Sequence, residues 1–471
     1  MHLTSQDIFL SYIFPEIKNT LYDYTWIDLY CGEGNLIFPI LEKVPIHERV
    51  DFFKEHIYLS DIQHQMVQKC IEKAQSYNIP LEIAENNIFC RDNLHSFPKR
   101  LKKNHKPLYH ITNPPYLYLG YIRKHEETKR HLKYFENENE GYQDLYQIAM
   151  INDLRNELEN LIYIIPSNFI FGASVSNKFR MDFLNHYNII KMLIFETQIF
   201  DFTGTNICIG FFQRKKFENA NPQKFKGIKF KKNDKILVRE YCLTPEFKYR
   251  GGAEFDEFIN KFKAIKPLNV KYYLRDKDVE ANKGKNEIEV IDTNEYISNE
   301  YKRKRLKVND YLKEKVKSNI LYIRTVDTGS LEGRAGLNII KEDFNVDGIY
   351  VSKATYRTSP IQIFLTPTIS FFDQILLKNY FNLLLEYFRE KLDSEFLTTY
   401  KYSNAEYTRK YLGLTQVRNL IETFPINYKQ DDRKKLIDLL KSKEVDKVLK
   451  LLSNLKEKNQ KNKLNKIEDW L

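Results

Sequence analysis

The chain has 471 residues and a formal net charge of +11; 42% of its residues are hydrophobic and 14% aromatic, which is enough for the packed cores of two domains. No apolar run approaches the roughly 20 residues that a bilayer-spanning helix needs, and residues 1–20 lack the pattern of a signal peptide. The five cysteines form no C-x-x-C pair, which predicts free thiols in the cytoplasm, without a disulfide framework or a zinc site.

The first motif lies near the N-terminus. Residues 24–30 predict a strand, and a glycine turn with a helix behind it follows at once, so that Asp28, Gly32 and Gly34 form the pattern D-x-x-x-G-x-G. This arrangement is typical of the first βα unit of a nucleotide-binding domain, because glycines let the backbone approach a ligand closely. The carboxylate of Asp28 could receive a charged amino group. Such a turn also occurs merely to join a strand to a helix, but the spacing of Asp28 from Gly32 favours the binding interpretation.

Two further acids follow predicted strand ends. Residues 56–61 predict a second strand that ends in Asp61, whose carboxylate could accept hydrogen bonds from ribose hydroxyls. Asp92 follows a third strand, where it would meet an adenine ring; a helix N-cap or an ion pair with Arg91 is an equally good interpretation. The elements predicted between these positions are a charged loop, a helix and the third strand, at residues 42–55, 62–77 and either 81–84 or 87–90.

The chain is organised around the sequence Asn-Pro-Pro-Tyr, residues 113–116, at the end of a fourth predicted strand. The two prolines forbid further ladder hydrogen bonds and fix φ, so the backbone leaves the sheet in a rigid turn. The amide of Asn113, the carbonyl of Pro114 and the ring of Tyr116 can hold a planar amine, with two acceptors on its N–H groups. The motif therefore favours group transfer to an exocyclic amine over a simple Pro-Pro loop with an Asn N-cap.

In this order the motifs resemble those of S-adenosylmethionine-dependent adenine-N6 DNA methyltransferases of the gamma type, over roughly residues 1–215. The resemblance implies an α/β fold, with a seven-stranded Rossmann-like catalytic domain at residues 1–215 that uses S-adenosylmethionine and no metal. It implies that Asn113 and Pro114 act on the target amine and that Tyr116 is both catalytic and base-stacking. The implied cofactor-binding residues are Thr4, which with Ser5 is a candidate N-cap of a first helix, and Asp28, Gly32, Gly34, Asp61, Asp92 and Asn113.

The resemblance also assigns the rest of the catalytic half. Residues 117–141 are polar and unpatterned, and in the family the corresponding loop closes over the target base. Residues 141–146 open a helix and resemble the family's Asn-Leu-Tyr motif, with Asp144 where Asn is commoner. Phe200 lies in the turn where the family has a second base-stacking ring, with Phe202 as the alternative. The remaining strands are expected at residues 161–166, 189–196 and 206–213.

The charge is concentrated in the second half, since residues 1–215 sum to −3 and residues 216–471 to +14. This imbalance predicts that the second half meets a polyanion. Residues 217–235 and 277–287 predict loops, and residues 371–396 predict a long helix. The densest basic run is Lys302, Arg303, Lys304 and Arg305, which predicts phosphate contacts unless it is a solvated helix face. A weaker resemblance implies a mixed α+β target-recognition domain with C-terminal helices at residues 230–471.

The sequence thus predicts a site-specific DNA methyltransferase that flips adenine out of duplex DNA and methylates its N6. A restriction-modification setting is expected, with a separately encoded restriction endonuclease as a further partner and no membrane. Two alternatives stay open: a methyltransferase for another amino acceptor, such as an RNA base or a protein glutamine, and a DNA-binding protein with a degenerate methyltransferase domain.

Overall fold

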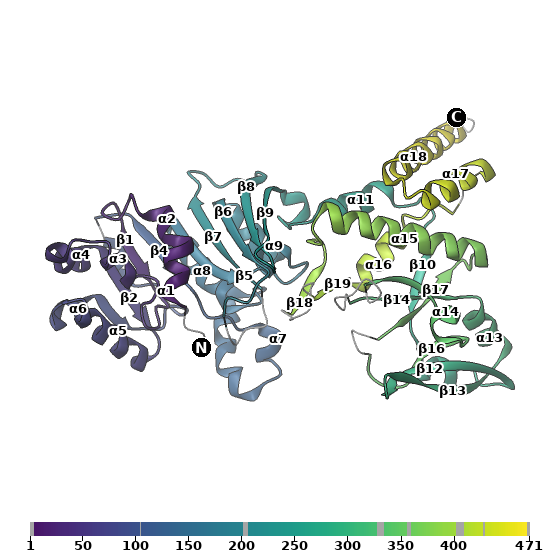
Figure 1. Ribbon diagram of the computed structural model, residues 1–471, viewed down its shortest axis with the longest axis horizontal. Coiled ribbons are helices and arrows are strands. Elements are labelled where there is room, and N and C mark those ends of the chain that lie inside the picture. Colours follow the sequence, from purple (N-terminus) through teal and green to yellow (C-terminus); the bar gives the residue numbers. More distant parts are fainter. Residues whose placement is uncertain are drawn as a thin grey trace. The chain divides into compact units, whose positions relative to one another are not determined.

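The chain forms two compact units, Met1–Gly251 and Gly252–Leu471 (Figure 1). The structure is a computed structural model, and it describes residues 4–103, 105–200, 206–326, 334–355, 359–401, 409–426 and 429–468. Each unit has its own hydrophobic core. Within the described ranges, no helix combines the length and the apolar character needed to cross a bilayer. All five cysteines are free, as predicted.

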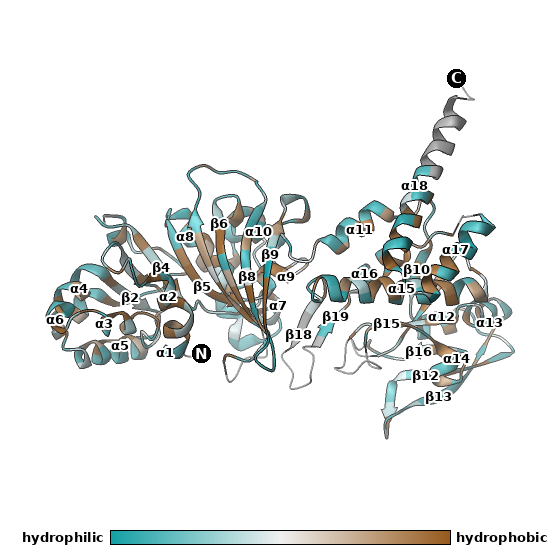
Figure 2. Ribbon diagram, turned by 45° about the horizontal axis from the view of Figure 1, so that its top comes forward, coloured by the Kyte–Doolittle hydropathy of each residue, from teal (hydrophilic) through white to brown (hydrophobic). Residues whose placement is uncertain are grey.

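A nine-stranded sheet in the order β3-β2-β1-β4-β5-β7-β6-β8-β9 forms the centre of the first unit. Its strands are β1 Thr25–Asp28, β2 Ile57–Asp61, β3 Ile88–Cys90, β4 Leu108–Thr112, β5 Asn160–Pro166, β6 Tyr187–Phe195, β7 Ile207–Arg214, β8 Gln223–Phe230 and β9 Ile236–Leu243. The strands from β3 to β5 are parallel, and β7 runs antiparallel between β5 and β6. Figure 2 shows hydrophobic residues concentrated in the central strands, as expected for strands buried on both faces.

The predicted count of seven strands is wrong, because two more strands extend the sheet. β8 pairs in parallel with β6, and β9 pairs antiparallel with β8. Residues 217–235, predicted as a loop, therefore contain the whole of β8 and the turn after it. The first unit extends to Gly251 and does not end at residue 215.

Helices cover both faces of this sheet. The α-helices of the first unit are α1 Gln6–Ile8, α2 Phe14–Ile17, α3 Phe38–Leu41, α4 Arg49–His56, α5 His64–Ser76, α6 Leu81–Asn87, α7 Leu119–Ile122, α8 Leu145–Arg155, α9 Asn168–Phe171 and α10 Asn177–Leu184. Residues 42–55, predicted as a loop, contain most of α4. Of the two placements for the third strand, residues 87–90 are confirmed by β3, whereas residues 81–84 belong to α6.

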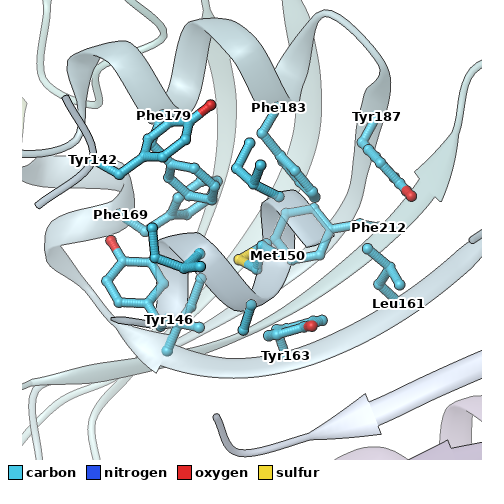
Figure 3. Packing of buried hydrophobic residues seen from close by; sticks show 14 of the residues in the cluster. Tyr142, Tyr146, Met150, Leu161, Tyr163, Phe169, Phe179, Phe183, Tyr187 and Phe212 are labelled. Carbon is cyan, nitrogen blue, oxygen red and sulfur yellow. The ribbon is translucent and has the colours of Figure 1, made fainter. Parts of the chain in front are cut away.

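Alternate residues of β5 show how the core is divided. Leu161 and Tyr163 belong to one core cluster, and Ile162 and Ile164 belong to the other, because successive strand residues point to opposite faces. The first cluster is rich in aromatic rings from α8, α9, α10 and β7 (Figure 3). Its rings interlock edge to face, as Phe183 and Phe212 do at 5.3 Å between centroids, which is a favoured aromatic geometry.

The second unit combines two four-stranded sheets, in the orders β10-β17-β14-β15 and β11-β16-β12-β13, with a two-stranded sheet and helices. Its strands are β10 Asn269–Tyr272, β11 Leu274–Arg275, β12 Asn286–Ile297, β13 Glu300–Val308, β14 Leu321–Arg324, β15 Gly336–Ile339, β16 Gly348–Val351, β17 Ile361–Thr366, β18 Thr398–Lys401 and β19 Arg409–Tyr411. Its helices are α11 Glu254–Phe262, α12 Asp276–Glu280, α13 Asp310–Lys317, α14 Ile340–Phe344, α15 Phe371–Lys391, α16 Leu414–Ile421, α17 Gln430–Lys441 and α18 Val445–Glu468. α15 confirms the predicted long helix and lies at the centre of this core.

Candidate active site

The ends of β1 and β4 meet where the strand order reverses, which is the usual ligand-binding position in an open parallel sheet. The Thr112 hydroxyl donates a hydrogen bond to Asp28 Oδ1 at 2.6 Å, and the Tyr30 N–H donates to the same oxygen at 3.0 Å. Asp28 is 1% exposed, and burial raises its pKa to about 6. The sequence analysis did not predict a role for Thr112 in the site, because its partner Asp28 lies 84 residues away in the chain.

Asp61 and the glycine turn form one hydrogen-bonded unit. The Gly32 N–H donates to Asp61 Oδ2 at 3.0 Å, and the Gln63 N–H donates to Oδ1 at 2.9 Å. Burial raises the pKa of Asp61. Gly34 has a φ of +73°, and a Cβ there would lie 2.3 Å from the ring of Phe38, so a larger residue would force this turn to shift. The two predicted motifs are thus neighbours.

Asp92 lies in the turn after β3 and already has partners. The Tyr134 hydroxyl donates to Asp92 Oδ2 at 2.7 Å, and the His95 N–H donates to Oδ1 at 3.2 Å. Among the described residues, the suggested ion pair between Asp92 and Arg91 is not formed. Arg91 instead donates a hydrogen bond to the hydroxyl of Ser96 at 2.8 Å. A turn-stabilising role therefore accounts for Asp92, and its predicted contact with the cofactor stays a prediction.

Asn113 follows β4, and both ends of its amide are engaged. Its Nδ2 donates to Thr4 Oγ1 at 3.0 Å, so the structure places Thr4 next to the predicted catalytic residue. The Tyr116 hydroxyl lies within hydrogen-bonding distance of Asn113 Oδ1 and of the Ile164 carbonyl, the latter at 2.5 Å. Burial raises the pKa of Tyr116 well above its usual value. The structure thus brings Asn113 and Tyr116 together. The Tyr116 hydroxyl lies at Asn113 Oδ1, which is the acceptor that a target amine would need.

The chain beyond Tyr116 is fixed to the start of α8 by Asp144. The Leu117 N–H donates to Asp144 Oδ1 at 2.9 Å, and Tyr118 and Asp144 form an isolated antiparallel bridge. Asp144 is 7% exposed, and burial raises its pKa to about 7. The carboxyl at this position therefore orients the segment that leaves the Asn-Pro-Pro-Tyr turn.

Phe200 and Tyr116 belong to different core clusters. The ring of Phe200 is 6% exposed and belongs to the core cluster that contains Ile164, whereas Tyr116 packs at the border of the opposite cluster, with its ring 6.4 Å from that of Tyr146. The alternative, Phe202, lies outside the described residues. A stacking role for Phe200 stays a prediction, and it requires the ring to leave its present packing.

Residues 117–141, predicted as an unpatterned loop, are mostly helical. They contain α7 and two 3-10 helices, Glu126–Phe135 and Asn137–Asn139. The segment is anchored by buried apolar side chains, namely Leu119, Ile122, Tyr134 and Phe135. Its surface carries the exposed cations Arg123 and Lys124, for which the described part of the chain offers no ion-pair partner, and Tyr121, whose ring stacks on His125 at 3.8 Å.

The predicted basic run lies on β13 and not on a helix face. Lys304 forms ion pairs with Asp292 and Glu295, both at 2.6 Å, and Lys302 pairs with Glu295 at 2.7 Å. β12 opposite carries its own acids, and the hairpin from residue 286 to 308 has five basic and five acidic residues, hence no net charge. The density of basic residues along the sequence therefore overstates the positive potential here.

A family model matches this chain over residues 49–200: that of Eco57I, described as a restriction-modification methylase. The match confirms the resemblance to a restriction-modification methylase for this segment, and the gamma type and the adenine target stay predictions. The segment contains Asp61, Asp92, Asn113 and Tyr116, whereas Asp28 lies before it. A comparison of the sequence with curated proteins found no match.

Solved structures give distant similarities. A proposed modification subunit of a type I restriction enzyme from Vibrio vulnificus YJ016 has 15% identity and a TM-score of 0.37, over 71% of this chain and 58% of that chain. The type IIG restriction endonuclease BpuSI has 12% identity and a TM-score of 0.41, over 94% and 61%. A nuclease-deletion mutant of the type ISP restriction-modification enzyme LlaGI has 11% identity and a TM-score of 0.46, over 93% and 47%. The present chain spans less than two thirds of each of these proteins.

Proposed function

We propose that the protein is an S-adenosylmethionine-dependent DNA methyltransferase that acts on adenine N6 in a specific duplex sequence. The observation that carries the proposal is the position of Asn113-Pro-Pro-Tyr at the end of β4, beside the buried carboxyl of Asp28 on β1. The Eco57I-family match around this tetrapeptide supports methyl transfer within a restriction-modification system.

The residues at the ends of β1 and β2 suit S-adenosylmethionine. Asp28 is buried with a pKa raised to about 6, so a cationic amino group beside it would stabilise its carboxylate. Asp61 would accept hydrogen bonds from ribose hydroxyls, through the lone pairs that the N–H groups of Gly32 and Gln63 leave free. The turn of Gly32 and Gly34 allows the backbone to approach the cofactor closely. The bound cofactor supplies an electrophilic methyl group.

The chemistry on the acceptor side is electrostatic. The adenine amine is a poor nucleophile, because its lone pair is delocalised into the ring. Hydrogen bonds from its two N–H groups to Asn113 Oδ1 and the Pro114 carbonyl favour a pyramidal nitrogen and stabilise the positive charge that develops on it. The amine must displace the Tyr116 hydroxyl from Asn113, and the Tyr116 ring then stacks on the base; Phe200 is proposed for the other face. This stacking offsets the few kcal/mol that base flipping costs.

The second unit is proposed as the target-recognition domain. It has 41 basic and 33 acidic residues, and a net positive charge favours association with DNA phosphates. Lys302 and Lys304 already form ion pairs within the hairpin. Of the predicted basic run, we therefore propose only Arg303 and Arg305 for contacts with DNA phosphates. A separately encoded endonuclease is the proposed partner. The alternative of a degenerate enzyme gains no support from the site, where Asp28, Asn113 and Tyr116 are all in place. The alternative of another amino acceptor stays open at the site, and the basic second unit is what favours DNA over it.

The proposal is tested by expressing the chain in a host that lacks DNA methylation and reading modified bases together with their sequence context. We expect N6-methyladenine in one defined sequence and in no other. Methylated cytosine would refute the adenine assignment. Unmodified DNA, combined with methyl transfer from labelled S-adenosylmethionine to RNA or protein in a lysate, would refute DNA as the substrate.

A further inference from the structure

A chain of hydrogen bonds links the glycine turn to Asn113 through the N-terminal segment. Lys73 Nζ donates to Asn35 Oδ1 at 2.5 Å, and Asn35 Nδ2 donates to the Thr4 carbonyl at 2.8 Å. The Thr4 hydroxyl in turn accepts from Asn113 Nδ2 at 3.0 Å. Thr4 is 7% exposed, so water does not compete freely for these bonds. Four sequence positions far apart are therefore connected at the proposed active site.

We propose that Thr4 is a positioning residue that orients the Asn113 amide and couples it to the glycine turn. This inference rests on the proposed function and deepens it. An Asn side chain can present either its oxygen or its NH2 group to a ligand, and hydrogen bonds decide which. Because the Thr4 hydroxyl takes an amide hydrogen of Asn113, Oδ1 points to the other side, where the target amine needs an acceptor.

The coupling to the turn follows from Asn35, which comes directly after Gly34. Its side chain fixes the backbone of Thr4, so a ligand that orders the turn also orders the group that holds Asn113. The Thr4 side chain thereby acts on the methyl acceptor and not on the cofactor, which differs from the cofactor-binding role that the sequence resemblance implies for it. The two roles predict different effects of removing the hydroxyl.

The first experiment compares Thr4→Val, which removes the hydroxyl at similar volume, with Thr4→Ser, which retains it. Methyl transfer from tritiated S-adenosylmethionine to genomic DNA of a methylation-free host is measured at saturating cofactor, and cofactor affinity is measured by calorimetry. We expect Thr4→Val to slow transfer roughly five- to tenfold, as the loss of one hydrogen bond does. Its cofactor Kd should stay within about twofold of wild type, and Thr4→Ser should restore most of the rate.

Several outcomes would overturn the inference. A cofactor Kd raised several-fold in Thr4→Val, with an unchanged rate at saturation, would make Thr4 a cofactor-binding residue. Equal rates and affinities in Thr4→Val and wild type would show that the hydrogen bond has no role in transfer. Loss of activity in Thr4→Ser as well would point to a packing role. If wild-type protein labels no DNA, the proposed function itself fails, and that result is distinct from all three.

The second experiment tests the coupling through Asn35. Asn35→Asp keeps an acceptor for Lys73 but loses the donor to the Thr4 carbonyl, and it should slow transfer by a factor similar to that of Thr4→Val. If one chain of bonds transmits the effect, the rate of the double variant Asn35→Asp with Thr4→Val should lie within about twofold of the rate of the slower single variant. Independent, multiplicative effects would refute the coupling.

Discussion

Asp144 gives a prediction that can be followed from its environment to a measurable slope. Its carboxyl is buried at the start of α8, and burial raises its pKa to about 7. In the unfolded chain an aspartate has a pKa of about 3.9. The folded protein therefore binds this proton more tightly than the unfolded chain does. The contribution of Asp144 to the free energy of unfolding is thus highest below about pH 4. That contribution is lost as the pH rises to about 7.

The magnitude follows from the two pKa values. Each unit of difference is worth about 1.4 kcal/mol, so ionising Asp144 in the folded state costs about 4 kcal/mol at neutral pH. Asp144→Asn keeps an oxygen that accepts the Leu117 N–H but carries no charge. We expect Asp144→Asn to raise the free energy of unfolding of the first unit by up to about 4 kcal/mol above pH 7, and to change it little near pH 4.

The assay is urea-induced unfolding between pH 5 and 8.5, read by hydrogen exchange in peptides of α8, because two units need not unfold in one step. The difference between Asp144→Asn and wild type isolates this carboxyl from Asp28 and Asp61, whose pKa values burial also raises. Glu126→Gln, which removes one carboxylate at an exposed position, is the control for the loss of a negative charge alone. A difference between Asp144→Asn and wild type that is the same at pH 5 and pH 8 would refute the reasoning.

Three further predictions concern the ligands. Asn113→Ala should abolish methyl transfer and leave the cofactor Kd within a few-fold; near-wild-type turnover on duplex DNA would contradict the assigned chemistry. Since a cationic amino group lowers the pKa of Asp28 from about 6, calorimetry should show cofactor affinity falling below pH 6, and Asp28→Asn should remove that dependence. The double variant Arg123→Ala with Lys124→Ala should reduce the slope of log DNA affinity against log salt by about 2, whereas Lys304→Ala, whose ammonium is already paired, should change it little.

The parts of the site that follow strand ends were predictable from the sequence. A parallel strand reads as a short apolar run, and a polar residue at its end stands out, as Asp28, Asp61 and Asn113 do. The glycine turn and the proline pair add local constraints on the backbone. The contacts between these positions were not predictable, because the bonds from Thr112 to Asp28 and from Thr4 to Asn113 join residues 84 and 109 positions apart.

The wrong predictions share a physical cause, which is tertiary packing that local composition does not report. Residues 223–230 alternate lysine with apolar residues and read as a loop, yet pairing with β6 makes them a strand. Residues 117–141 are mostly polar, and four buried apolar side chains suffice to fold most of them against the first unit. Residues 42–55 were predicted as a loop because of their charges, and the burial of Phe52 and Phe53 makes residues 49–56 a helix.

The basic run on β13 shows why a charge pattern read along one dimension can mislead about DNA binding. Alternate residues of a strand point to opposite faces, so Arg303 and Arg305 are separated from Lys302 and Lys304. The neighbouring strand then neutralises the second pair through Asp292 and Glu295. A lysine on an edge strand also has a structural use, since it discourages edge-to-edge aggregation. Of the predicted run, only Arg303 and Arg305 thus remain candidates for the proposed phosphate contacts, and salt titrations of single variants can test them and locate further contacts elsewhere in the chain.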